Sequence, residues 1–259
     1  MSDSARWQAQ PWELLTATPE SPAMNLALDE ELTLRVGAGE RPPTLRIWSW
    51  TSSCIVLGRF QSVQNEVQVE NADRLGVEIV RRISGGGAMF IEPEGAITWS
   101  LYVPAEAAAG LSFAESYAFF DSWVISALRS LGIDAFYAPL NDITSATGKI
   151  GGAAQARRGG AILHHTTMAY QMNIGVMMEV LRIGQEKLSD KGIRSADKRV
   201  APLRQQTNLP RQVIIDHLIA EFANLTDLRA GAITAQERDG AETRARERIN
   251  TEAWRYIIP

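Results

Sequence analysis

Hydrophobic residues recur every three or four positions in several stretches of the chain, which is the period of one face of an α-helix. The clearest stretch begins at Ser112 and Glu115, which have the spacing of a capping box, and continues to Gly132. Another begins at Ser21 and Pro22, residues typical of a helix start. Further helices are expected over residues 176–183, 215–222 and 237–248, the last of them solvated and of mixed charge.

Other stretches alternate apolar and polar residues, which is the period of a strand with one buried face. Residues 97–103 show this pattern most clearly, with Ile97, Trp99, Leu101 and Val103 on the apolar side. Further strands are expected over residues 44–50, 54–57, 77–80, 149–154, 161–164 and 168–174. Because strands and helices do not alternate strictly, we expect an α+β fold in which helices flank mixed, largely antiparallel sheets.

The composition is that of an ordinary globular protein, with 45% hydrophobic and 22% charged residues and a net charge of −4. The single cysteine, Cys54, excludes an intrachain disulfide, and only three histidines are present for a metal cluster. No signal segment or membrane-spanning run is evident, so we expect a cytoplasmic protein without a membrane partner. The mild acidity argues against a nucleic-acid partner but allows one local basic patch.

A basic and glycine-rich stretch, RRISGGG, occupies residues 81–87. The backbone of consecutive glycines can approach a ligand closely, and neighbouring guanidinium groups favour a carboxylate or a phosphate. The stretch therefore predicts a cationic anion site. The alternative is a glycine-rich turn beside two surface arginines. The dinucleotide-binding fingerprint is excluded, because Phe90 stands where its last glycine is required.

Lys149 lies in a predicted strand and is flanked by glycines. A lysine that points inward from a strand is costly unless it meets an anion, so Lys149 faces either an anionic ligand or solvent at a strand edge. Asn141 and Asp142 shortly precede it. The carboxylate of Asp142 suits either a divalent cation that bridges phosphates or a turn cap, and the sequence does not choose between them.

The adjacent residues His164 and His165 fall in or beside a predicted strand, so one of the two is expected to face the core. Neither histidine has a serine and a carboxylate at a recognisable spacing for a catalytic triad, and a Ser-His-Asp hydrolase is not expected. Residues 187–209 are polar and basic without clear periodicity, which predicts a long loop. Its basic residues suit either closure over an anionic ligand or a simply solvated loop.

Taken together and in this order, these pieces resemble the lipoate-protein ligase A family, within the wider group of biotin and lipoyl ligases and lipoyl or octanoyl transferases. The resemblance covers roughly residues 24–203. It rests on GRFQSVQNE at 58–66, RRISGGGA at 81–88, ND at 141–142, KIGGAAQ at 149–155 with LHHTT at 163–167, and KLSDKGIRSADKRV at 187–200.

The resemblance implies a single catalytic domain over residues 1–259, with a biotin/lipoyl-ligase-like fold and no C-terminal accessory domain. The glycine-triplet loop and the lysine strand would face each other across its cleft. Such enzymes activate lipoate with ATP and Mg²⁺ to lipoyl-adenylate. They then transfer the lipoyl group to one lysine of a lipoyl domain, in 2-oxoacid dehydrogenase E2 subunits or in glycine-cleavage H protein. A separate accessory-domain polypeptide is a further candidate partner.

The same resemblance assigns roles to individual residues. Lys149 is the expected catalytic residue, and Asp142 is the candidate Mg²⁺ ligand. The dithiolane tail is expected between apolar walls near Val80 and Met168. The lipoate and adenylate site is expected to comprise Arg82, Ser84, Gly85, Gly86, Gly87, Asn141, Asp142, Gly152, Ala154, His165 and Thr167.

The chain departs from the family pattern at Ile91-Glu92, Gly151 and Thr166, where the family has histidine-aspartate, serine and glycine. One alternative is an ATP-independent octanoyl or lipoyl transferase of the same fold. Those enzymes use a cysteine nucleophile, whereas Cys54 lies outside the lysine block. A biotin-protein ligase is less well matched, because its glycine-rich loop usually has a GRGR-like sequence. A non-catalytic acyl-binding homologue is the remaining alternative.

Overall fold

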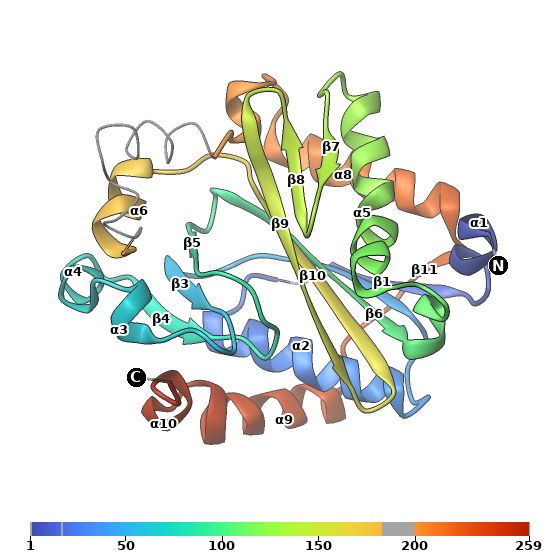
Figure 1. Cartoon of the computed structure of the whole chain (residues 1–259). Coiled ribbons are helices and arrows are strands. Elements are labelled where there is room, and N and C mark those ends of the chain that lie inside the picture. Colours follow the sequence, from blue (N-terminus) through green and yellow to red (C-terminus); the bar gives the residue numbers. More distant parts are fainter. Residues whose placement is uncertain (1, 17, 183–199, 259) are drawn as a thin grey trace.

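The computed structural model describes residues 2–16, 18–182 and 200–258, and two sheets form its framework (Figure 1). The larger sheet runs from edge to edge through β11 (Leu228–Ala230), β1 (Trp12–Thr16), β2 (Thr44–Trp48), β6 (Ala96–Pro104), β10 (Ala161–Ala169), β9 (Gly148–Arg158), β8 (Asp142–Ser145) and β7 (Phe136–Ala138). The smaller sheet has the order β4 (Glu78–Arg81), β3 (Cys54–Leu57) and β5 (Met89–Ile91).

Most neighbouring strands are antiparallel. The parallel pairs are β1 with β2, β1 with β11, and β3 with β4. The mixed, largely antiparallel α+β fold expected from the sequence is therefore confirmed. Strand β10 forms long antiparallel pairs with both β6 and β9 at the centre of the larger sheet. The smaller sheet lies beside this centre (Figure 1).

Helices occur in all five stretches where the sequence predicts them, and four short helices, at residues 3–7, 63–66, 69–74 and 252–255, were not predicted. The helices are α1 (Asp3–Trp7), α2 (Pro22–Gly37), α3 (Val63–Glu66), α4 (Val69–Arg74), α5 (Phe113–Ser130), α6 (Ile174–Val180), α8 (Arg211–Leu225), α9 (Ala235–Arg244) and α10 (Glu252–Arg255). The chain also forms the 3₁₀ turns η1 (Ala105–Ala108) and η3 (Leu203–Gln205) and the π-helical turn η4 (Ala245–Ile249). The capping box is confirmed, because Ser112 and Glu115 each accept a hydrogen bond from the other's amide. The hydroxyl of Ser21 likewise accepts from the amide of Met24, 3.2 Å away.

Helices cover both faces of the larger sheet. Helices α5 and α8 pack on one face through an aromatic core in which the rings of Trp123 and Phe222 meet edge to face, 5.0 Å apart. Helix α2 covers the other face, where Leu32 and Val36 pack against Leu163. Within the part of the chain that the structure describes, no helix is long and apolar enough to cross a membrane.

Burial of both faces corrects the expectation for residues 97–103. Strand β6 was expected to be half-buried, but all residues from Ala96 to Val103 are buried. The polar side of the alternation faces α2, where Ser100 and Tyr102 donate hydrogen bonds to the carboxylate of Asp29. Polar residues in this strand are therefore internal hydrogen-bonding groups, not a solvated face.

Other expectations change in their boundaries. Residues 161–169 form one strand, β10, and the strand predicted for 168–174 is wrong beyond Ala169, because Ile174 begins α6. In the predicted helix over 237–248, Glu237 is buried and paired with Arg41 at 2.6 Å, so this helix is not fully solvated. Of the loop predicted over 187–209, residues 187–199 lie outside the described residues, and η3 follows them.

Candidate functional site

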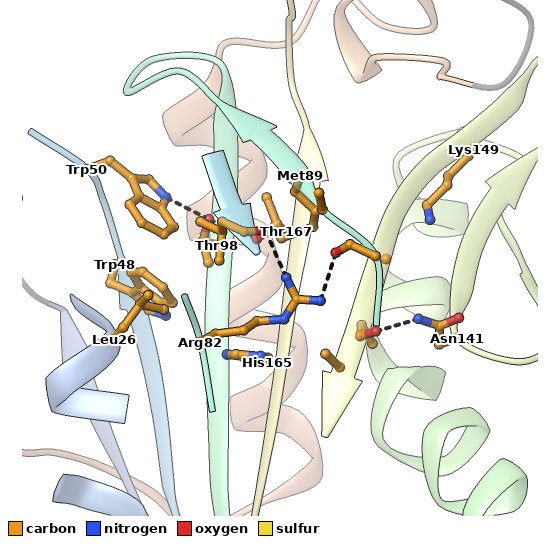
Figure 2. Close-up of a pocket in the computed structure, with 16 residues that line it drawn as sticks. Leu26, Trp48, Trp50, Arg82, Met89, Thr98, Asn141, Lys149, His165 and Thr167 are labelled. Carbon is orange, nitrogen blue, oxygen red and sulfur yellow. Dashed lines mark hydrogen bonds between the residues drawn. The ribbon is translucent and has the colours of Figure 1, made fainter. Parts of the chain in front are cut away.

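A pocket lies between the β9–β10 hairpin and the loop that joins β4 to β5 (Figure 2), and a second pocket adjoins it along β5. The first, here the tryptophan pocket, has a cavity volume of about 90 Å³ and has Leu26, Trp48 and Trp50 along one side. The second, the methionine pocket, has a cavity volume of about 180 Å³ and is the more apolar of the two. Its methionines are Met89, Met168, Met172 and Met177. Lys149 lines both pockets, so its ammonium group can serve ligands in either one.

Strand register explains the position of Lys149. Asp142 in β8 pairs with Gly152 in β9, and a bulge follows between Ile143 and Thr144. The Lys149 ammonium lies 2.6 Å from an oxygen of Asp142. A Cβ atom at Gly152 would stand only 3.0 Å from Lys149 Nζ, so the missing side chain makes room for this ion pair. Both charged groups are partly exposed, which leaves the lysine available to an incoming anion.

Alternation along β10 separates its polar residues onto two faces. His165 and Thr167 line the tryptophan pocket. His164 and Thr166 point to the opposite face, where each lies within hydrogen-bonding distance of Asp121 Oδ1 in α5, at 2.9 and 3.1 Å. The prediction that one of the two adjacent histidines faces the core is therefore confirmed, and it is His164 that does so.

The glycine loop, residues 82–88 between β4 and β5, is organised around the guanidinium group of Arg82. This group is buried and donates hydrogen bonds to the carbonyls of Gly85 and Gly87 at 2.7 and 2.9 Å. Burial lowers the pKa of Arg82 to about 10, so the side chain still carries its charge at neutral pH. In the described part of the chain, no acceptor is bonded to the amides of Gly85, Gly86 or Gly87. These amides are available to an anionic ligand beside a buried positive charge.

The glycine loop is also held from outside. A Cβ atom at Gly58 would lie 2.0 Å from the carbonyl oxygen of Gly86, so only glycine allows the two loops to approach this closely. Gly86 itself has φ +93°, a conformation that residues with a side chain rarely adopt. The Arg59 amide completes the contact by donating to the carbonyl of Ser84 at 2.8 Å.

Arg81 does not belong to the pocket, which corrects the expectation that both arginines form one cationic site. Its guanidinium group is buried and donates to the carbonyls of Gly58, Gln61 and Arg255 at 2.9, 2.6 and 2.7 Å. Trp254 of α10 returns a hydrogen bond to the Arg81 carbonyl at 2.8 Å. The first arginine of the motif therefore ties the C-terminal segment to the base of the glycine loop.

The structure brings most of the predicted site residues together. The tryptophan pocket is lined by Arg82, Gly87, Asn141, Lys149, Gly152, Ala154, His165 and Thr167. Four predicted residues do not line it. Ser84 lies behind it, hydrogen-bonded to His165, and Asp142 is paired with Lys149, while Gly85 and Gly86 belong to the adjoining loop.

Some pocket residues were missed by the sequence analysis. They are Leu26, Trp48, Trp50, Val56, Met89 and Thr98. The alternation over 44–50 placed both tryptophans on one side of a strand, but nothing local indicated that this side lines a pocket. The apolar wall expected near Val80 is misplaced, because Val80 packs in the core and Val56 of the neighbouring strand lines the pocket. Met168 does line the methionine pocket.

The departures from the family pattern fit their surroundings. Ile91 is buried in the apolar core, and the carboxylate of Glu92 accepts a hydrogen bond from the Asn173 amide at 2.7 Å. A Cβ atom at residue 151 would lie 2.8 Å from the carbonyl oxygen of Thr167, which explains glycine at this position. Ile91, Glu92 and Gly151 also line the methionine pocket, so these departures change part of its wall. Lys149, Gly152 and Thr167 remain in the walls of both pockets.

Cys54, the single thiol of the chain, is fully buried in the apolar core between α2 and the smaller sheet. Burial raises its pKa well above the ordinary value, so the reactive thiolate form is disfavoured. Cys54 lines neither the tryptophan nor the methionine pocket. The thiol therefore lacks both the ionisation and the access that a nucleophile requires.

The fold, with one lysine in the wall shared by two pockets, was compared with known protein families. The model of the Lipoyl protein ligase A/B catalytic domain matches residues 21–223. The chain belongs to this family. It is therefore an enzyme of the group that contains the lipoate ligases and the octanoyltransferases.

Particular relatives cover nearly the whole chain. Octanoyltransferase LipM of Kyrpidia tusciae is 29% identical, over 95% of this chain and 99% of the relative. A structure of a bi-partite lipoate protein ligase and its E2 lipoyl domain from Thermoplasma acidophilum matches with 28% identity and a TM-score of 0.83, over 95% of each chain. A structure of lipoate-protein ligase A bound with ATP matches with 25% identity and a TM-score of 0.82, over 95% of this chain and 98% of the other.

Proposed function

We propose that the chain is an ATP-dependent lipoate–protein ligase, which forms lipoyl-adenylate and passes the lipoyl group to a lysine of a lipoyl domain. The observation that carries the proposal is the contrast between Lys149 and Cys54. The lysine ammonium lies in the wall shared by two pockets, whereas the single thiol is buried outside both. The site is therefore equipped to stabilise anions and lacks a nucleophilic thiol.

Two pockets that meet at one lysine suit two substrates that react with each other. The side formed by Leu26, Trp48 and Trp50 offers an apolar surface for a dithiolane or alkyl tail. The carboxylate of a lipoate whose tail binds on this side would then reach Lys149 and the glycine-loop amides. The methionine pocket, with its apolar lining, would hold the nucleotide base on the far side of the same lysine.

The residues of the chain would act mainly by electrostatic stabilisation. A carboxylate oxygen of lipoate attacks the α-phosphorus of ATP, the bond to the bridging oxygen breaks, and pyrophosphate leaves. Negative charge builds up on the phosphoryl oxygens, and the ammonium of Lys149 lies at the junction where they would sit. The amine of the acceptor lysine, after losing a proton, then attacks the acyl carbonyl and AMP departs.

Mg²⁺ would neutralise phosphate charge during the first step. Two acidic side chains lie at the pockets. Glu92 lines the methionine pocket and accepts a hydrogen bond from the Asn173 amide, whereas Asp142 has one carboxylate oxygen in the ion pair with Lys149. Among the described residues, no group of three or more histidine, cysteine or acidic side chains could hold a metal ion. An ion at this site would therefore be held by Asp142 together with water and substrate phosphates, which is the usual arrangement for Mg²⁺ with nucleotides.

The partners of the proposed ligase follow from its relatives. The matched Thermoplasma ligase is described as bi-partite, within a lipoylation system that includes its E2 lipoyl domain. We therefore include a lipoyl domain as acceptor, of an E2 subunit or of glycine-cleavage H protein, and a separate accessory polypeptide that assists adenylation. The similarity to the Thermoplasma ligase over 95% of that chain supports both of these proposed partners.

ATP-independent octanoyl transfer is the second candidate, and the similarity to octanoyltransferase LipM favours it. Such a transfer from a carrier-protein thioester commonly proceeds through an acyl-enzyme intermediate on a thiol. Here it would require direct attack by the acceptor lysine, because Cys54 is buried away from the pockets. Lys149 would then stabilise the oxyanion of the tetrahedral intermediate.

A paired assay separates the two candidates. The protein is incubated with lipoate and Mg-ATP, alone and with a candidate accessory polypeptide, and pyrophosphate release is followed. A lipoyl domain is then added and its mass is measured. The ligase predicts pyrophosphate release and a mass gain equal to one lipoyl group. The ligase also predicts no mass gain of the lipoyl domain in a parallel reaction with octanoyl-carrier protein and no ATP.

The opposite pattern would replace the proposal with the transferase. Cys54→Ala serves as the matched control in both reactions, because it removes the single thiol without touching the pocket lining. A mass gain without ATP that vanishes in Cys54→Ala would show that the thiol becomes accessible, and the ligase assignment would then be rejected.

A further inference from the structure

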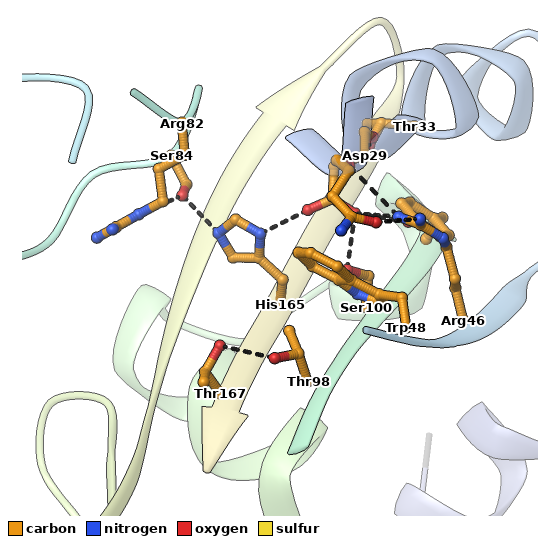
Figure 3. Close-up of polar contacts among 12 residues, drawn as sticks. Asp29, Thr33, Arg46, Trp48, Arg82, Ser84, Thr98, Ser100, His165 and Thr167 are labelled. Carbon is orange, nitrogen blue, oxygen red and sulfur yellow. Dashed lines mark hydrogen bonds and ion pairs between the residues drawn. The ribbon is translucent and has the colours of Figure 1, made fainter. Parts of the chain in front are cut away.

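A buried carboxylate on helix α2 is connected to the glycine loop through a continuous series of hydrogen bonds (Figure 3). Asp29 Oδ2 lies 2.7 Å from Nδ1 of His165, and the other ring nitrogen, Nε2, lies 2.6 Å from the hydroxyl of Ser84. The Ser84 hydroxyl in turn accepts from Nε of Arg82 at 3.1 Å. Because Arg82 holds the carbonyls of Gly85 and Gly87, the series reaches the loop itself.

The charge state of Asp29 sets the direction of these hydrogen bonds. Burial alone would raise the pKa of Asp29, but the hydrogen bond from His165 and the nearby charge of Arg46 outweigh it and lower the pKa. The ionised carboxylate can only accept hydrogen bonds, so Nδ1 of His165 must carry a proton. Burial lowers the pKa of His165, so the ring is neutral and its Nε2 must accept from Ser84.

We propose that Asp29 is a positioning residue of the site. It selects the His165 tautomer and, through Ser84 and Arg82, it orients the glycine-loop amides toward the ligand. Asp29 touches neither pocket, and no local pattern in the sequence links it to His165, which is 136 positions away. The role of the loop as an anion site rests on the proposed function, whereas the tautomer and the loop geometry do not depend on it.

The serine, histidine and aspartate have the connectivity of a hydrolytic triad, but their burial indicates a different role. Ser84 is buried, is not part of the lining of either pocket, and has its oxygen engaged by Arg82. A nucleophile must reach its substrate. Asp29, His165 and Ser84 are instead well placed to hold the glycine loop. Each hydrogen bond in the series determines which group donates and which accepts in the next hydrogen bond.

Asp29→Asn tests the proposal with almost no change in shape. The Oδ1 position accepts from both Ser100 and Tyr102, at 2.8 and 2.6 Å, so the amide oxygen of asparagine should occupy it. The amide nitrogen would then face His165 as a donor. Nδ1 of His165 would have to accept, and the proton would move to Nε2, opposite Ser84.

Tyr102→Phe is the matched control. It removes one hydrogen bond to the same carboxylate but leaves the Asp29–His165 contact and the donor from Ser100 in place. Both variants should lower the unfolding temperature. Asp29→Asn also removes the carboxylate charge 3.7 Å from the buried Arg46, so it should lower the unfolding temperature further than Tyr102→Phe. Only Asp29→Asn should reverse the tautomer, so a purely structural role of Asp29 predicts that the glycine-loop amides and the catalytic rate respond alike in the two variants.

Nitrogen-15 NMR of the free protein provides the first measurement. The chain has only three histidines, and His217→Gln and His164→Gln variants identify the His165 signals. We expect a protonated Nδ1 in the wild type and a protonated Nε2 in Asp29→Asn, with shifted amide resonances of Gly85, Gly86 and Gly87. A wild-type ring protonated on Nε2, or unchanged loop amides in a folded Asp29→Asn protein, would overturn the proposal.

The second measurement is the rate of pyrophosphate release with lipoate and Mg-ATP. We expect kcat/KM to fall by about tenfold or more in Asp29→Asn, mainly through kcat, and to stay within about twofold in Tyr102→Phe. Equal losses in both variants would overturn the positioning role. If Asp29→Asn does not fold, Ser84→Ala interrupts the same series downstream. It should shift the loop amides while Nδ1 of His165 remains protonated, and unchanged loop amides would again overturn the proposal.

The two proposals fail in different ways. A wild-type protein that releases no pyrophosphate, alone or with a partner, contradicts the ligase assignment but leaves the NMR comparison intact. A wild-type ligase whose Asp29→Asn variant keeps its tautomer and its loop amides contradicts only the role of Asp29.

Discussion

The ammonium group of Lys149 lies 2.6 Å from the carboxylate of Asp142, over the bare backbone of Gly152. Both side chains are partly exposed, so the ion pair contributes little to stability, on the order of 0–1 kcal/mol. Its value lies in keeping a charged lysine at the junction of two pockets. A ligand anion can replace Asp142 as partner without leaving a buried charge unpaired.

Lys149→Ala is therefore expected to reduce adenylation by about 10²–10³-fold, because it removes the group that meets the developing charge. The free energy of unfolding should change by less than about 1 kcal/mol. The measurements are pyrophosphate release and urea denaturation. Lys149→Arg keeps the positive charge but replaces the compact ammonium group with a planar guanidinium group, so it should retain part of the activity. An alanine variant with the wild-type rate would contradict the proposed role.

Cys54→Ala should preserve the rate of lipoyl transfer within about twofold, since the thiol lines neither pocket and its pKa is raised by burial. The small cavity should cost about 1 kcal/mol of stability. In the native protein, iodoacetamide should not label the thiol until a denaturant is added. Rapid labelling of the folded protein would show that Cys54 is accessible.

Trp50→Leu should widen the apolar side of the tryptophan pocket. The indole of Trp50 donates to the hydroxyl of Thr98 at 3.1 Å and contacts Trp48 in a tilted arrangement, with ring centres 4.7 Å apart. Each further buried methylene is worth about 0.8 kcal/mol, so the ratio of kcat/KM for a ten-carbon acid to that for an eight-carbon acid should rise by about tenfold. An unchanged ratio would place the acyl tail elsewhere.

Arg81→Lys should lower the free energy of unfolding by about 3 kcal/mol, because a lysine cannot satisfy the carbonyls of Gly58, Gln61 and Arg255 at once. The C-terminal segment should become more susceptible to limited proteolysis before the rest of the protein unfolds. Arg59→Lys is a suitable control, because Arg59 stacks on Trp254 but is not buried. Similar losses in both variants would contradict the tie between Arg81 and the C-terminal segment.

Stability should depend on pH through His165. Burial lowers the pKa of His165 below its ordinary value of 6.5, although the hydrogen bond with Asp29 opposes the shift. Between these two pKa values the unfolded chain binds a proton that the folded protein does not. The contribution of the neutral His165 ring to the free energy of unfolding is therefore complete above pH 6.5. It is lost as the pH falls, and the free energy of unfolding then decreases by up to about 1.4 kcal/mol per pH unit.

Urea denaturation at a series of pH values measures this slope. In His165→Gln the contribution of this residue should disappear, so the curve below pH 6.5 should become flatter than that of the wild type. A steeper curve in His165→Gln would contradict a lowered pKa for this histidine.

Local patterns in the sequence determined much of the fold. The capping box at Ser112 and Glu115 and the Ser21-Pro22 start involve residues close together in the chain, so their hydrogen bonds can be inferred from spacing alone. The glycine triplet and Lys149 could likewise be recognised as short motifs with a chemical meaning. The family resemblance then joined them in one site, and the pocket contains both.

Only the tertiary structure decided which neighbouring residue performs which role. Arg81 and Arg82 are adjacent in the sequence, yet one binds the C-terminal segment and the other binds the glycine loop. The contact between Asp29 and His165 joins positions 136 apart, through a helix packed on a sheet. Local periodicity reports which face of an element is apolar, but it carries no information about which distant element covers that face. The free energy that selects these pairs arises only when the layers pack.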